Sequence, residues 1–157
     1  MTAIFEPQWL VPLFAAFWFG GAAIMARLAG WAKLAAAFPA SAPPTGESFR
    51  FVTAIVGSRH FPIKYRNCCH LVVADRGIYL SLMFPFKFQS PAFFVPWSAV
   101  ENVVEAQQLS NRAVTLHFQG QLAQVTLRGP LGQLMLAAYN EATAENVASA
   151  GTQPGPT

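Results

Sequence analysis

Charged residues are scarce in this chain: only 11% of its 157 residues are Asp, Glu, Lys or Arg, whereas 54% are hydrophobic. This share of charge is unusually low for an ordinary globular domain. The net charge of +3 is also too small for the basic surface that nucleic-acid-binding proteins carry. We therefore expect no nucleic-acid partner.

Cysteine is also rare, and its placement excludes an ordinary disulfide. The two cysteines, Cys68 and Cys69, are adjacent, so pairing them would close a strained eight-membered ring outside normal disulfide geometry. This is consistent with a reducing compartment. Two cysteines also fall short of the four ligands that a structural zinc site needs.

Motifs that carry chemistry are missing as well. The chain has no glycine-rich phosphate loop and no G-x-S-x-G turn, and none of its seven carboxylates is paired for acid–base work. We expect no catalytic residue, no cofactor and no metal. An alternative is a thiol-dependent enzyme or redox sensor built on Cys68, Cys69 and His70, because Cys68 and His70 share one face of a strand.

A long uncharged run lies near the N-terminus. Residues 7–26 contain no charged side chain, and the segment from Trp9 to Gly30 would extend about 33 Å as a helix, enough to cross a bilayer. Trp9 and Trp31 stand where aromatic belts are expected. The run is not preceded by Lys or Arg, which argues against a cleaved signal peptide. We predict a transmembrane helix over residues 9–30; a buried or partner-packed helix is the alternative.

The distribution of basic residues predicts an orientation for this helix. Arg27 and Lys33 follow the run and none precedes it, so the N-terminus is expected outside and the rest of the chain in the cytoplasm. Gly20 and Gly21 would allow close packing against another membrane helix. A structural subunit of a membrane complex is therefore a further alternative.

The chain divides into four segments by composition. We expect the transmembrane helix and a juxtamembrane extension in residues 1–38, a proline-rich connector in 39–48, a β domain in 49–147 and a disordered tail in 148–157.

Within the β domain the hydrophobic pattern has a period of two, which predicts strands. The alternation is clearest where Val114, Leu116 and Phe118 occupy every second position. After Pro130 the period becomes helical, with an apolar stripe on one face. We predict seven short antiparallel strands followed by one amphipathic C-terminal helix.

This order of elements resembles the pleckstrin-homology-like superfold. The motifs GWAKLA, HLVVADRGIYLSLMF and PAFFVPWSAV are similar to those of uncharacterised bacterial proteins in which one membrane helix carries a PH-like or GRAM-like domain. The resemblance implies seven strands in two near-orthogonal sheets, capped by the C-terminal helix. It also implies a bacterial inner-membrane protein with a non-enzymatic, cytoplasmic module that binds a protein partner or the lipid surface.

A basic loop is the first candidate binding site. In PH domains that bind inositol phosphates, a K-x-R pair in the first hairpin contacts the phosphates, and Lys64 and Arg66 match that pair, with Arg59 upstream. Such side chains suit a phosphate or an anionic lipid headgroup. The alternative is an ordinary solvated loop.

An aromatic segment is the second candidate. Its residues, together with one tryptophan that follows the uncharged run, are Trp31, Phe84, Phe86, Lys87, Phe88, Phe93 and Phe94. If exposed, they would form an apolar patch for a membrane or a protein partner. The alternative is that these rings fill the interior of the domain.

Overall fold

The computed structural model describes residues 9–28, 30–84, 86–88, 90–108, 111–121 and 123–150. The helices are α1 (Leu10–Leu28), α2 (Trp31–Ala37) and α3 (Pro130–Ala150). The strands are β1 (Glu47–Gly57), β2 (Pro62–Ala74), β3 (Gly77–Leu82), β4 (Phe93–Pro96), β5 (Val100–Gln108), β6 (Asn111–Phe118) and β7 (Gln124–Arg128). Short 3-10 helices span Phe86–Phe88, Trp97–Ala99 and Gln119–Gln121.

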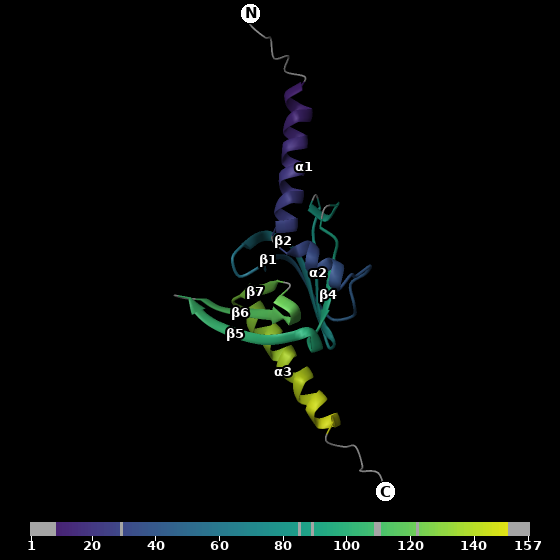
Figure 1. Ribbon diagram of the computed structural model, residues 1–157. Helices are drawn as coiled ribbons and strands as arrows, with labels where there is room; N and C mark the ends of the chain where they lie inside the picture. Colours follow the sequence, from purple (N-terminus) through teal and green to yellow (C-terminus); the bar gives the residue numbers. More distant parts are fainter. Residues whose placement is uncertain are drawn as a thin grey trace, which may run out of the picture.

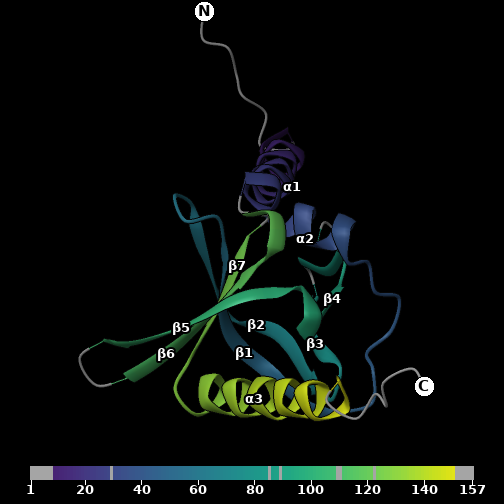
Figure 2. The ribbon, with the colours of Figure 1, turned by 60° about the horizontal axis from the view of Figure 1, so that its bottom comes forward.

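The strands in the described part of the chain form one antiparallel sheet in the order β4-β3-β2-β1-β7-β6-β5. Figure 2 shows that this sheet curls into a half-barrel, with α3 lying across it. The prediction of two near-orthogonal sheets is wrong because β1 joins the two halves. Val56 in β1 pairs with Ile63 of β2 on one side and with Val125 of β7 on the other.

The curl of the sheet has a local cause in β1 and β2. Their pairing is irregular between Phe49 and Ala54, and Phe51 and Asn67 adopt positive φ angles of 58° and 49°. The Asn67 amide donates a hydrogen bond to Thr53 Oγ1 (3.1 Å), whose hydroxyl donates to Asn67 Oδ1 (3.0 Å). Bulges of this kind bend a strand and increase its twist, so a single sheet turns the corner.

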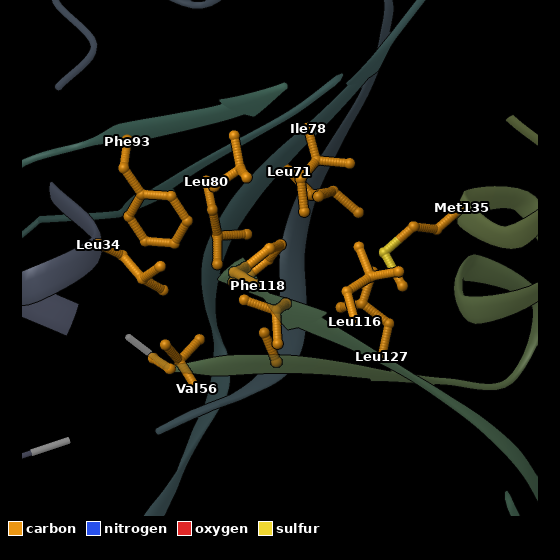
Figure 3. Packing of buried hydrophobic residues seen from close by; sticks show 14 of the residues in the cluster. Leu34, Val56, Leu71, Ile78, Leu80, Phe93, Leu116, Phe118, Leu127 and Met135 are labelled. Atoms are coloured by element: carbon orange, nitrogen blue, oxygen red, sulfur yellow. The ribbon is translucent and has the colours of Figure 1, made fainter. Parts of the chain in front are cut away.

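The core fills the concave side of this sheet. Figure 3 shows Leu34 of α2 beside Phe93 of β4, and Met135 of α3 facing Leu116 of β6 and Leu127 of β7. The inward positions predicted in β6 are confirmed, because Val114, Leu116 and Phe118 are at most 1% exposed.

The first helix is shorter than the sequence predicts. No helix in the described residues is both long and apolar enough to cross a membrane. α1 has 19 residues, which extend about 28 Å, whereas the predicted helix over residues 9–30 would extend about 33 Å. It ends at Leu28, before Gly30 adopts a left-handed conformation with φ 82°. The predicted transmembrane helix over residues 9–30 is therefore wrong, and so is the single-pass inner-membrane location with a cytoplasmic domain.

The juxtamembrane extension is instead part of the folded domain. Trp31 and Leu34 of α2 are fully buried in the core, and the following segment is held to β4 by a bridge between Pro39 and Phe93. The core therefore includes residues upstream of the predicted boundary at 49. At the other end α3 continues to Ala150, and the rest of the predicted tail lies outside the described residues.

Candidate functional site

α1 exposes large apolar side chains on all its sides. Nine large apolar residues in α1 and just before it each have between 50% and 80% of their surface exposed: Trp9, Leu10, Val11, Leu13, Phe14, Phe17, Trp18, Phe19 and Ile24. Because successive residues are about 100° apart around a helix axis, these positions cover the whole circumference. We call this set of residues the α1 surface.

α1 contacts the domain through α2, which follows its carboxyl end (Figure 1). Figure 1 shows α1 projecting away from the sheet, with α2 beneath its last turn. α2 itself is fixed because the Trp31 indole contacts Tyr65 and Phe93 edge-on, with ring centroids 5.1 and 4.9 Å away. A rigid base thus carries a helix on which the side chains of the α1 surface are not buried by the domain. Exposed apolar patches of this size mark sites of interaction.

The basic residues predicted to bind phosphate lie on the β1–β2 hairpin. Arg59 is exposed at its tip, and Lys64 and Arg66 are exposed on the same face of β2. The tip is shaped by Ser58, whose carbonyl and hydroxyl oxygens both accept from the Phe61 amide at 3.2 Å. Figures 1 and 2 both place this hairpin at the end of the domain from which α1 projects. A phosphate site there stays a prediction.

The aromatic candidates divide between core and surface. Trp31 and Phe93, for which a membrane or partner contact is predicted, are fully buried, because α2 and β4 close this part of the half-barrel. Phe86 and Phe94 are partly buried. Phe84 is 79% exposed and Lys87 is exposed, whereas the side chain of Phe88 lies outside the described residues.

The thiol pair has one buried and one half-buried member. Cys69 lies in the core and Cys68 is half-buried. A hydrogen bond with the Cys69 thiol lowers the pKa of Cys68 to about 7, although burial acts in the opposite direction. The same hydrogen bond and burial raise the pKa of Cys69 above its usual range.

His70 has a partner other than a thiol. Its Nε2 is hydrogen-bonded to the Ser48 hydroxyl at 2.8 Å, and burial and the positive charge of Arg50 lower its pKa. Across the described part of the chain, no three His, Cys, Asp or Glu side chains gather closely enough to hold a metal ion.

Sequence reasoning missed an acidic groove between α3 and the β2–β3 turn. Its cavity volume is about 320 Å³. The apolar floor is formed by Val73, Ala74, Leu134, Ala137, Ala138 and Ala142, and the carboxylates at its rim are Glu47, Asp75, Glu141 and Glu145. The four-residue spacing of Glu141 and Glu145 was the only local signal, since folding brings Glu47 and Asp75 to them from elsewhere in the sequence.

No known protein-family model matches this chain, and no curated protein sequence matches it.

Proposed function

We propose that this chain is a non-enzymatic binding module whose α1 surface docks into an apolar groove of another protein. The observation that carries the proposal is the exposure of the α1 surface on every side of the helix. Trp and Phe are the side chains on which interface cores and binding hot spots depend. Phe17, which is 80% exposed, and Trp18 are therefore expected to act as anchors.

The all-round apolar surface favours an enclosing partner over a second copy of α1. One parallel or antiparallel neighbour covers a single stripe of a helix, whereas a helix that is apolar all round needs neighbours on several sides. Burying four or five large apolar side chains of the α1 surface in a partner contributes on the order of 10 kcal/mol to the free energy of binding. Association itself costs roughly 4–15 kcal/mol, so most of the α1 surface has to be buried for stable binding.

The resemblance to PH-like and GRAM-like domains is part of the proposal. It is supported by the succession of seven antiparallel strands and one C-terminal helix. In this interpretation the half-barrel is the scaffold, and α2 fixes the direction in which α1 leaves it. Fold alone does not assign a function, so the proposal depends on the α1 surface.

The proposal is tested by the mass of the assembly that the full chain forms in its source cell. Tagged wild-type chain is isolated and measured by size-exclusion chromatography with light scattering, beside Phe17→Glu and Val147→Glu. Val147 is 69% exposed on α3, so its variant introduces the same charge on an exposed apolar position outside α1. We expect the wild type and Val147→Glu to co-elute with one other protein, and Phe17→Glu to elute without that second protein.

Each of the following results would contradict this function. The wild type could elute alone as a monomer, it could form an assembly that contains only copies of itself, or Phe17→Glu could retain the second protein. The tryptophan fluorescence could also shift when lipid vesicles are added without any other protein, which would mean that the α1 surface binds lipid.

A further inference from the structure

We propose that the acidic groove receives the tip of the β1–β2 hairpin from a second copy of this chain, so that molecules associate head to tail. We call Arg59, Phe61 and Lys64 the basic tip. The inference is independent of the α1 surface. It rests on two complementary features that the fold places at opposite ends of one strand.

The acidic groove offers an apolar floor beneath a negative rim. Four of the seven carboxylates in the chain line this one cavity. Arg76, exposed in the same turn as Asp75, offsets one of these charges and leaves the rim negative. A cavity of about 320 Å³ with this chemistry suits an apolar side chain flanked by cations.

The basic tip has this chemistry. Phe61 is 67% exposed, and in the sequence it lies between the exposed residues Arg59 and Lys64. Residues 57–66 contain no acidic side chain, so the positive charge of the hairpin is not compensated locally. The hydrogen bonds from the Phe61 amide to Ser58 hold the tip in shape, which lowers the entropy that docking costs.

The groove and the tip cannot meet within one molecule. β1 begins at Glu47, which lines the groove, and ends at Gly57, which leads into the tip. Eleven residues of strand extend roughly 33 Å, less a little for the bend near Phe51. Figure 2 likewise shows the hairpin tip and α3 at opposite ends of the domain. Two different surfaces that complement each other give a heterologous interface, which forms a ring or an open chain of copies.

Charge reversal in the full chain tests this interface. We compare Glu141→Lys/Glu145→Lys in the groove with Arg59→Glu/Lys64→Glu at the tip. The matched control is Glu101→Lys/Glu105→Lys, which reverses two exposed carboxylates of β5 at the same spacing. Mass is measured by sedimentation over a range of concentrations and salt. We expect wild type and control to associate, and each test variant to associate at least about tenfold more weakly, because like charges then face each other.

Mixing the two test variants gives the most specific result. The acidic tip of one variant complements the basic groove of the other, and the unchanged surfaces also remain complementary. We therefore expect the equimolar mixture to associate like wild type. Association through the groove weakens as salt rises, whereas association through the apolar α1 surface strengthens.

The proposal is overturned if wild type stays monomeric at every concentration, if its association strengthens with salt, or if the mixture of folded variants stays monomeric. Circular dichroism confirms folding before mixing. If Glu141→Lys/Glu145→Lys does not fold, Glu145→Lys alone replaces it, because Glu145 is exposed near the end of α3.

Discussion

The indole Nε1 of Trp31 donates a hydrogen bond to the backbone carbonyl of Pro91 at 2.9 Å, and so joins residues 60 positions apart. Trp31 begins α2, and Pro91 lies just before β4. The bond and the surrounding ring contacts fasten α2 into the open side of the half-barrel. They also fix the base from which α1 projects.

We expect Trp31→Ala to lower the free energy of unfolding by about 3–5 kcal/mol, the usual cost of removing a buried tryptophan. The cost arises from the lost packing and from the unpaired carbonyl of Pro91. Urea unfolding measures it. Trp9→Ala is the control, since Trp9 is exposed, and we expect it to leave the midpoint unchanged. Equal effects of the two substitutions would show that α2 is not part of the core.

The positive φ angle of Phe51 predicts a stabilising substitution. A non-glycine residue in the left-handed region costs roughly 1–2 kcal/mol, and Phe51 is exposed, so little packing is lost with its ring. We expect Phe51→Gly to raise the free energy of unfolding by about 0.5–1 kcal/mol after the entropy cost of glycine. Phe61→Gly is the control, because Phe61 is as exposed without a positive φ, and it should be neutral or destabilising. A loss of stability in Phe51→Gly would contradict the strain at the bulge.

The two thiols are expected to react differently with iodoacetamide. Only the thiolate reacts, and the pKa of Cys68 is about 7, so its alkylation rate should reach half its maximum near neutral pH. Cys69 is buried and should not react in the native state. Mass spectrometry of labelled peptides measures both rates.

Cys69→Ala provides the control for this behaviour. It removes the hydrogen bond that lowers the pKa of Cys68, so the midpoint of the rate profile should shift upward toward about 8.5, the value of a free thiol. An unchanged midpoint would mean that another group sets the reactivity of Cys68.

The lowered pKa of His70 predicts that the protein is less stable in acid. Burial and Arg50 lower its pKa, so the unfolded chain takes up a proton on this side chain at a higher pH than the folded protein does. The free energy of unfolding therefore falls as the pH decreases below the unfolded pKa of about 6.5. We expect urea midpoints at about pH 7.5 and about pH 5.5 to differ more in wild type than in His70→Gln. Equal differences would assign the pH dependence to other groups.

Local patterns in the sequence predicted the strands and α3, because alternation and helical periodicity are properties of neighbouring residues. In β6, Val114, Leu116 and Phe118 point inward as their spacing indicates. The continuity of the sheet was not predictable in this way. It depends on β1 pairing with both β2 and β7. The positive φ angle of Phe51 has no sequence signal, since a phenylalanine rarely adopts it.

Features built from distant residues were missed for the same reason. Because Trp31 follows an uncharged run, the sequence predicted that it lies at a membrane interface. Its burial instead depends on Pro91 and Phe93, which are about 60 positions away in the sequence. The acidic groove combines Glu47 and Asp75 with two residues of α3, and only the folded chain brings them together. The basic hairpin was found from sequence because Arg59, Lys64 and Arg66 lie within one loop and strand.

The α1 surface is tested most directly by photo-crosslinking in the source cell. The photoreactive amino acid p-benzoylphenylalanine replaces Phe17 in the full chain, and in a control it replaces Val147 on α3. We predict that position 17 forms one dominant adduct with a single other protein and that position 147 does not. An adduct of two copies of this chain at position 17, the same adducts from both positions, or no adduct with a protein would contradict the account.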